Sequence, residues 1–253
     1  MKRMTTRIVF LASLVLLWQL LWSLEIWPPY VFPSPLEVLQ SMIDGFVDTT
    51  FPRAIAGSLR RVAIGFGVSV AVGVPLGILV GRKRLVENTI GTLVMGLQAL
   101  PSISWLPLAM LWFGLSERSI VFVIIMGGLM AITISTADGV RNSPPIFVKA
   151  ARTMGARGFF LYRRVILPSV LPAIVSGLKL GWSFAWRSLM AGELLYMTVG
   201  LGQLLTMGRE LNDMARVIAV MLVIIFIGLL VDRLIFAPVE RRLRERWGSA
   251  DTA

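Results

Sequence analysis

Long apolar runs dominate the sequence, and short segments rich in charged residues separate them. Six such runs lie at residues 8–24, 62–81, 86–111, 119–138, 166–190 and 215–236. Each is close to the roughly 20 residues that a helix needs to cross about 30 Å of hydrocarbon. The pattern therefore predicts an all-α integral membrane protein with six transmembrane helices.

The first run admits two interpretations. Lys2, Arg3 and Arg7 precede it, as they would in a signal peptide, but no small-residue cleavage site follows. The next segment, LWSLEIWPPY, has the aromatic residues of a membrane interface. We interpret residues 1–55 as an N-terminal anchor helix followed by a periplasmic loop.

Glycine and proline mark two places inside the spans. Gly73, Gly77 and Gly81 recur every four residues on one helix face, which favours close packing against another helix over a specific gating role. Pro101 and Pro107 interrupt the third run and predict a helix that is kinked or locally unwound there. Irregular backbone at that depth must face protein or a water-filled cavity, which points towards a pathway.

The charges between the runs predict the orientation, because cytoplasmic loops carry the excess of Lys and Arg. Basic clusters occur before the first run, at 82–84, from 141 to 164, and in the tail at 239–253; the alternate loops hold acidic residues instead. Both termini should therefore be cytoplasmic. Arg60 and Arg61 lie on the wrong side of this scheme, and we interpret them as part of an interfacial helix that runs from about residue 53 into the second span.

Composition supports a membrane protein and excludes several functions. The chain of 253 residues is 56% hydrophobic, above the roughly 45–50% of soluble domains. Its net charge of +11 lies between apolar runs, which favours membrane orientation over binding of nucleic acid. Cysteine, histidine and a phosphate-binding P-loop are absent from the sequence, so we expect no catalytic residue, no metal site and no cofactor in this chain.

The fifth run carries a polar stripe. Ser176, Lys179, Ser183 and Arg187 fall within about an 80° arc of a helix, and Lys179 is half way along it. A charge at that depth costs several kcal/mol unless it meets a partner or water, so the stripe should not face lipid. Two interpretations stay open, and each can hold in part. In one, these residues with Glu193 line a translocation pathway that favours an anion.

In the other interpretation, the same cations form internal ion pairs. The carboxylates within reach are those of Asp138, Glu193 and Asp232, while Arg187 extends outwards from near the end of the helix.

Residues 141–168 form a basic segment between the fourth and fifth runs. Ser143 followed by prolines predicts a helix start, and Gly155 is placed to end that helix in a left-handed conformation. The stretch ARGFFLYRRVI then predicts a second short helix that ends before Pro168. The segment should form two short helices outside the membrane.

This segment, KAARTMGARGFFLYRRVILP, resembles the EAA loop of ABC importer permeases. Ala150, Ala151, Gly155, Leu167 and Pro168 match that motif, while Lys149 stands where the family has an acidic residue. The stretches FPSPLEVLQSM, SLRRVAIGFGVSVAVGVPLGILVGR, PSISWLPLAMLWFGLSERS and 211–248 extend the likeness to nearly the whole chain. They resemble the nitrate, taurine and alkanesulfonate subfamily.

The resemblance implies a type I importer fold with a five-helix core and an N-terminal helix, the transmembrane domain being residues 56–238. It implies coupling to a separate ATPase, which binds ATP and Mg²⁺, through Lys149, Ala150, Ala151, Arg152, Gly155, Ala156, Leu167 and Pro168. The expected partners are a second permease copy, two ATPase subunits, a periplasmic or lipid-anchored solute-binding protein, and membrane lipid. The expected location is the bacterial cytoplasmic membrane.

The resemblance also implies a small solute, with a sulfonate, taurine or nitrate as the first expectation. A pyrimidine-like vitamin precursor is the alternative within the same importer class. An ion-coupled secondary transporter would need carboxylates inside the membrane, yet Asp138, Glu193 and Asp232 all lie near span ends and no inverted repeat is evident. A membrane enzyme would need catalytic groups that the sequence does not contain.

Overall fold

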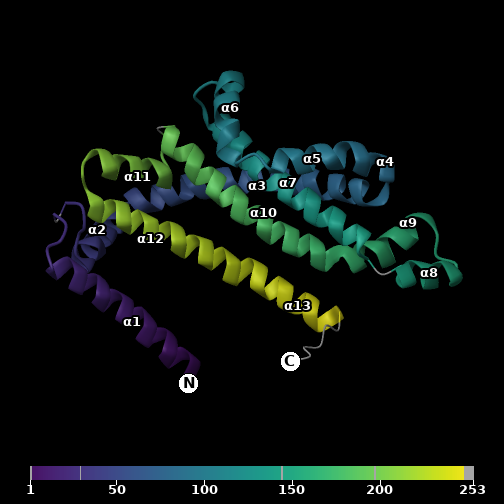
Figure 1. Cartoon of the computed structure of the whole chain (residues 1–253), viewed down its shortest axis with the longest axis horizontal. Helices are drawn as coiled ribbons and strands as arrows, with labels where there is room; N and C mark the ends of the chain where they lie inside the picture. The colour runs from purple at the N-terminus through teal and green to yellow at the C-terminus, as the bar shows by residue number, and fades with distance from the viewer. Residues whose placement is uncertain (1, 29, 144, 197, 248–253) are drawn as a thin grey trace. The chain divides into compact units, whose positions relative to one another are not determined.

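The computed structural model describes residues 2–28, 30–143, 145–196 and 198–247, and these contain helices and no strand. The helices of the N-terminal half are α1 (Lys2–Ser23), α2 (Pro35–Val47), α3 (Thr50–Arg82), α4 (Arg84–Val86), the π-helix η1 (Glu87–Gly91), α5 (Thr92–Gln98), the 3-10 helix η2 (Ser102–Trp105) and α6 (Leu106–Phe113). The remaining helices are α7 (Glu117–Arg141), α8 (Pro145–Thr153), α9 (Gly158–Leu161), the π-helix η3 (Tyr162–Ile166), α10 (Leu167–Leu195), α11 (Leu201–Glu210), α12 (Met214–Val231), the π-helix η4 (Asp232–Phe236) and α13 (Ala237–Trp247). Figure 1 shows their order along the chain. The all-α prediction is confirmed.

The chain forms two compact units, each built from discontinuous segments. The first unit contains Met1–Ser58 and Glu193–Ile227, and the second contains Leu59–Gly192 and Gly228–Ala253. The second unit therefore holds most of α3, α7 and α10 together with the basic segment between α7 and α10.

The described helices include four that are long and apolar enough to cross a membrane, namely Thr50–Arg82, Glu117–Arg141, Arg163–Leu195 and Met214–Leu243. Arg84–Gln98 and Ser102–Phe113 make a fifth only if they count as one span, because the chain bends by 102° between them. The apolar part of α1, Ile8–Ser23, is shorter than a full span. Of the six predicted runs, four thus form unbroken spans among the described residues, the third is the bent pair, and the first is a shorter apolar helix.

The bend in the third run confirms the break expected around Pro101. Figure 1 shows α6 turned away from the direction of α5. Pro101 has no N–H and disfavours a helical conformation in the residue before it, so α5 ends at Gln98 and a new helix begins at Ser102.

Arg60 and Arg61, which disagreed with the charge pattern, belong to α3 as expected. Their guanidinium groups lie 2.6 Å and 2.8 Å from the two carboxylate oxygens of Glu117 at the start of α7. Arg61 is only 2% exposed, so this ion pair accounts for a cation inside the unit. A basic residue held by a neighbouring helix gives no information about loop orientation.

A glycine stripe on α3 allows α7 to approach closely. A Cβ atom at Gly77 would lie 2.5 Å from the backbone oxygen of Thr133, and one at Gly81 would lie 2.7 Å from that of Ala137. At Gly73 the nearest atom would be a side-chain carbon of Ile132, 3.1 Å away. The stripe serves close helix packing, which the spacing predicts.

Gly77→Ala tests this packing. We expect the substitution to lower the free energy of unfolding by about 1–3 kcal/mol, because the new methyl group overlaps backbone that cannot move away independently. The measurement is the midpoint of thermal unfolding of the detergent-solubilised protein. Gly67→Ala is the matched control on the same helix, since no atom lies within 4 Å of its added Cβ. Equal midpoints for the two variants would contradict the close-approach interpretation.

Candidate functional site

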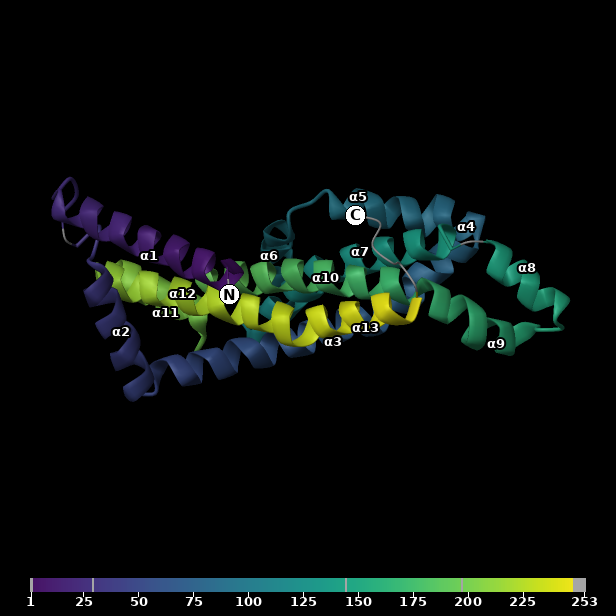
Figure 2. The same ribbon diagram turned by 90° about the horizontal axis from the view of Figure 1, so that it is seen from below.

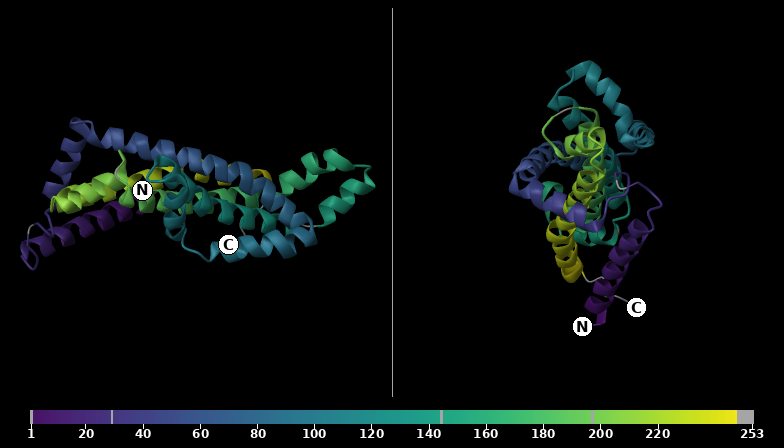
Figure 3. Two further views of the ribbon diagram at one scale, coloured as in Figure 1. Left: turned by 90° about the horizontal axis from the view of Figure 1, so that it is seen from above. Right: turned by 90° about the vertical axis from the view of Figure 1, so that its left-hand side faces the viewer.

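The segment between α7 and α10 forms a helical hairpin, α8–α9, that extends beyond the ends of these two helices (Figures 1 and 2). A third direction of view gives the same arrangement (Figure 3, left). Helices α7, α8, α9 and most of α10 belong to the same unit. The hairpin therefore projects from the membrane-spanning helices on short connections.

Gly155 makes the corner of the hairpin. Its φ angle is +87°, the left-handed conformation that the sequence predicted. The N–H of Gly155 donates to the Arg152 carbonyl at 3.0 Å, and the N–H of Ala156 donates to the Ala151 carbonyl at 2.9 Å. These two bonds form a Schellman motif, which satisfies the last carbonyls of α8 and fixes the direction of the chain.

The surface of the hairpin mixes cations with apolar side chains. Lys149, Ala150 and Arg152 are exposed, and Ala151 is half-buried. Two apolar side chains are also exposed, Met154 at 87% and Phe160 at 61%. Ala156, which follows the corner residue Gly155, is buried. Exposed apolar side chains next to cations are typical of a surface that binds another protein.

The second helix of the hairpin does not end before Pro168, contrary to the expectation. Helix α9 continues through the π-helix η3 into α10, which begins at Leu167. A proline ring clashes with the carbonyl four residues earlier, here that of Arg164, and a wide π turn relieves such a clash. The hairpin is thus joined to α10 by continuous helix.

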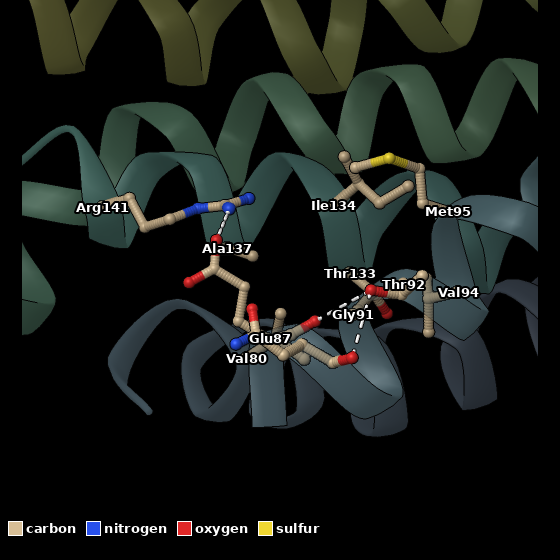
Figure 4. A pocket seen from close by; sticks show the side chains of 11 residues that line it. Val80, Glu87, Gly91, Thr92, Val94, Met95, Thr133, Ile134, Ala137 and Arg141 are labelled. Atoms are coloured by element: carbon tan, nitrogen blue, oxygen red, sulfur yellow. Dashed lines mark hydrogen bonds and ion pairs between the residues drawn. The ribbon is translucent and has the colours of Figure 1, made fainter. Parts of the chain in front are cut away.

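Ion pairs and a hydrogen bond between hydroxyl groups fix the chain at the start of the hairpin. Arg141, the last residue of α7, forms an ion pair with Glu87 of η1 and another with Asp138, the latter at 2.7 Å. Figure 4 shows Glu87 and Arg141 meeting at a cavity of about 180 Å³. Ser143 was expected to cap α8, but its Oγ instead lies 2.8 Å from the Oγ of Ser169. The helix begins after it, at Pro145, and Pro144 lies outside the described residues.

Lys179 forms internal ion pairs, which is the second of the two interpretations for the polar stripe. Its Nζ lies 2.9 Å from Oδ1 of Asp232 and 3.5 Å from Oε2 of Glu240. The three side chains are partly exposed, with between 25% and 42% of each accessible. Lys179 thus connects α10 to the helical segment formed by η4 and α13.

The π-helix η4 explains how one lysine reaches both carboxylates. In an uninterrupted α-helix, residues eight apart point about 80° away from each other. A π turn acts as one inserted residue, so Asp232 and Glu240 are related like residues seven apart, which differ by only about 20°. The sequence alone does not place Glu240 beside Lys179.

Arg187, the other cation of the stripe, has a different environment. No described residue forms an ion pair with it, and its guanidinium carbon lies 5.4 Å from the centre of the Phe184 ring. It lines a cavity of about 300 Å³ together with residues 97–102 at the end of α5 and residues of α7. The cavity therefore lies at the break in the third span.

The two serines of the stripe, Ser176 and Ser183, belong neither to the Lys179 ion pairs nor to the lining of the Arg187 cavity. Ser183 donates its hydroxyl hydrogen to the Lys179 carbonyl of its own helix at 3.1 Å, and Ser176 is exposed. Neither is among the residues that line the Arg187 cavity.

Glu193 is buried within the first unit, with 1% of its surface exposed. Its carboxylate accepts from the Ser58 hydroxyl at 2.8 Å and 2.9 Å and from the Gly202 N–H at 3.0 Å. The Ser58 oxygen in turn accepts from the Leu201 N–H at 2.9 Å. Because α11 begins at Leu201, the carboxylate stabilises the positive end of that helix and ties it to α3 and α10.

Sequence reasoning missed the residues that complete these sites. Gln98, Ser102 and Phe184 line the Arg187 cavity, and Ser58 holds Glu193. The only sequence signal for the first two is their position beside Pro101. Ser58 lies 135 positions from Glu193, and no local pattern connects them.

Comparison with known proteins identifies the family. Residues 73–245 match the family described as "Binding-protein-dependent transport system inner membrane component". The chain belongs to this family. A putative ABC transporter permease protein of Methanocaldococcus jannaschii is 36% identical, over 92% of this chain and 88% of its own length. The taurine transport system permease protein TauC of Escherichia coli is 30% identical, over 96% of this chain and 90% of its own length.

More distant relatives carry other substrate names. The nitrate import permease protein NrtB of Synechocystis is 28% identical over 90% of this chain and 85% of its own length. The putative aliphatic sulfonates transport permease protein SsuC of Bacillus subtilis is 26% identical over 92% of this chain and 84% of its own length. The relatives are named as transport permeases, so this family member is a transport component and not an enzyme.

A solved structure confirms the fold. A chain of the MetNI methionine ABC transporter, in an inward-facing conformation, superposes with a TM-score of 0.67 at 18% identity. The match covers 78% of this chain and 95% of that chain. This ABC permease has the type I importer fold and is a multi-pass membrane protein.

Lys179→Met tests whether the ion pairs stabilise the permease. Without the cation, Asp232 and Glu240 repel each other, and we expect a loss of about 1–3 kcal/mol in the free energy of unfolding. Adding Asp232→Asn should recover part of that loss. The measurement is a double-mutant cycle on thermal unfolding midpoints. Strictly additive effects of the two substitutions would refute a direct interaction.

Proposed function

We propose that this permease is the membrane-spanning subunit of an ATP-driven importer, and that the α8–α9 hairpin couples it to a separate ATPase. ATP and Mg²⁺ would bind to that ATPase. The Schellman corner at Gly155 carries the proposal, because it makes a rigid projection on a member of this family. Force applied to the hairpin would pass along the continuous helix η3–α10.

The surface composition supports the same role. Met154 and Phe160 supply apolar area for a groove on the ATPase, and Lys149 and Arg152 supply charge beside it. Ala150 and Ala151 allow close contact because their side chains are small. Leu167 and Pro168 begin α10 and connect the hairpin to the membrane. Arg141, held by Glu87 and Asp138, keeps the start of the hairpin in place.

Importers of this kind need further partners. The proposed assembly contains two copies of this chain, two ATPase subunits and a solute-binding protein at the outer face of the cytoplasmic membrane, with lipid around the spans. The hairpin must then be cytoplasmic. Residues 1–55 would form the N-terminal anchor and outer loop, residues 56–238 the transmembrane domain, and residues 239–253 a cytoplasmic tail with the N-terminus on the same side.

We propose that the solute is a small anion. The supporting observation is Arg187, which lines a cavity between spans without an ion pair to any residue that the structure describes. Arg187 is exposed, so its guanidinium group is accessible to an anionic solute. The taurine, nitrate and sulfonate names of the relatives agree with a solute that carries an acidic group.

Gly155→Val tests the coupling role. A β-branched residue is strained at φ +87°, although no atom lies within 4 Å of the added Cβ, so the substitution should distort the corner without a clash. We expect loss of the co-purifying ATPase and at least a tenfold lower rate of ATP-dependent uptake. The matched control is Gly155→Asn, because asparagine tolerates left-handed backbone. Full assembly and uptake in the valine variant would refute coupling through this corner.

A panel of solutes tests the substrate class. Cells that express the complete importer should accumulate at least one of pentanesulfonate, taurine and nitrate, whereas a neutral pyrimidine should neither enter nor compete. The measurement is uptake of each labelled compound, with cells that lack the ATPase as the background. Uptake of the pyrimidine alone would overturn the anion proposal and leave the importer class intact.

A further inference from the structure

Helix α2 connects the end of α1 to the start of α3. All of α1 and α2 and the first turns of α3 belong to the first unit of the chain. Figure 2 shows α2 crossing the directions of α1 and of these first turns. Its 13 residues extend about 20 Å, less than the roughly 30 Å of hydrocarbon that a span must cross. A short helix that runs across the ends of two apolar helices lies along the membrane surface.

Local contacts fix where α2 begins and which way its faces point. Ser34 and Glu37 form a capping box, in which the Ser34 Oγ accepts from the Glu37 N–H at 3.2 Å and Oε2 of Glu37 accepts from the Ser34 N–H at 2.7 Å. Gly45 lies against the fully buried Phe51 of α3, since a Cβ atom there would be 2.7 Å from the ring. The rotation of α2 about its own axis is therefore set by its contact with α3.

The side chains of α2 form three faces when placed at about 100° per residue. Val38 and Gly45 lie on the buried face. A second face spans about 100° and is apolar, although each of its residues is between 46% and 77% exposed; this apolar face consists of Leu36, Leu39, Ile43, Phe46 and Val47. The third face spans about 60° and is exposed and polar; this acidic face consists of Glu37, Gln40 and Asp44.

The surroundings of the apolar face fit a lipid surface. Exposed Ile26, Trp27 and Tyr30 precede α2, and aromatic residues of this kind are enriched at the level of lipid headgroups. A helix with separate apolar and charged faces is typical of one that lies in the membrane interface. A solute-binding protein would be a poorer occupant, because each time it left it would return this apolar area to water.

We propose that α2 is a membrane-surface helix, whose apolar face inserts at the boundary of headgroups and acyl chains in the outer leaflet while its acidic face lies in water. The choice of the outer leaflet rests on the cytoplasmic hairpin of the proposed function. Helix α2 contains no Lys or Arg, so the attachment depends on apolar area and not on anionic headgroups. Through Gly45 and Phe51 the helix holds the start of α3 at the membrane surface.

Spin labels on the two exposed faces test the proposal. The sequence contains no cysteine, so single cysteine variants label at one place. The variants are Leu39→Cys and Ile43→Cys on the apolar face, with Gln40→Cys and Asp44→Cys as matched controls on the acidic face. The sample is the permease–ATPase complex in phosphatidylcholine nanodiscs. The measurements are collision rates of each label with oxygen, which concentrates in lipid, and with a nickel chelate, which stays in water.

We expect the ratio of oxygen to nickel collisions to be about threefold or more higher at 39 and 43 than at 40 and 44. Equal access of the nickel chelate to both faces would place the apolar face in water and overturn the proposal. Labels at 39 and 43 that neither reagent reaches would also overturn it, because protein, such as the second copy, would then cover the face.

A charge added to the apolar face gives a second test. In the Ile43→Cys background, Leu39→Glu should raise nickel collisions at 43 about threefold or more, because a carboxylate resists insertion among acyl chains. Gln40→Glu adds the same charge to the acidic face and should leave collisions at 43 unchanged. Thermal unfolding and ATPase co-purification show whether each variant is intact. An equal effect of both substitutions would count against insertion of the apolar face alone.

The leaflet is tested separately from the lipid contact. A membrane-impermeant maleimide added to spheroplasts should label Gln40→Cys without permeabilisation. Labelling only after permeabilisation would overturn the outer leaflet and, with it, the orientation in the proposed function. The collision ratios in nanodiscs do not depend on orientation, so their failure would overturn the surface helix and leave the importer function intact.

Discussion

A charged side chain among apolar residues needs a partner. This requirement determines how several of the helices are positioned against one another. Arg61 meets Glu117, Lys179 meets Asp232 and Glu240, and the buried carboxylate of Glu193 meets Ser58 and the start of α11. Each pairing joins helices that are distant in sequence, so the cost of desolvating a charge becomes a contact that positions the helices. Arg187, by contrast, is exposed and lines the cavity at the break without an ion pair to a described residue.

Departures from regular helix occur beside the α8–α9 hairpin, the Arg187 cavity and the Lys179 ion pairs. Pro101 divides the third run and creates the cavity wall, while η3 lets the α8–α9 hairpin run into α10 despite Pro168. The π-helix η4 brings Asp232 and Glu240 to the same side, where both reach Lys179. Proline and the wider π turn thus shift the faces of helices without ending them, and in doing so they choose which side chains meet.

The proposed coupling hairpin and the Arg187 cavity lie in different parts of one structural unit. The α8–α9 hairpin lies at the end of α7 and α10, and the Arg187 cavity lies along the same two helices. A movement imposed on the hairpin would shift α10 along its length, because η3 connects them without a loop. Close packing through the glycine positions of α3 resists bending of α7 on its other side. The proposed mechanism therefore needs no element beyond rigid helices and one fixed corner.

By itself the sequence determined the local features: the apolar runs, the break near Pro101, the left-handed corner at Gly155 and the close packing at Gly77. These follow from hydrophobicity and backbone restrictions, which act within a few residues. Tertiary structure alone decided the partner of each charge. Four residues of one stripe looked equivalent at helical spacing, yet Lys179 is neutralised, Ser183 bonds to its own helix and Arg187 lines a cavity. Partners such as Glu240 and Ser58 lie far away in sequence, and only the folded chain brings them close.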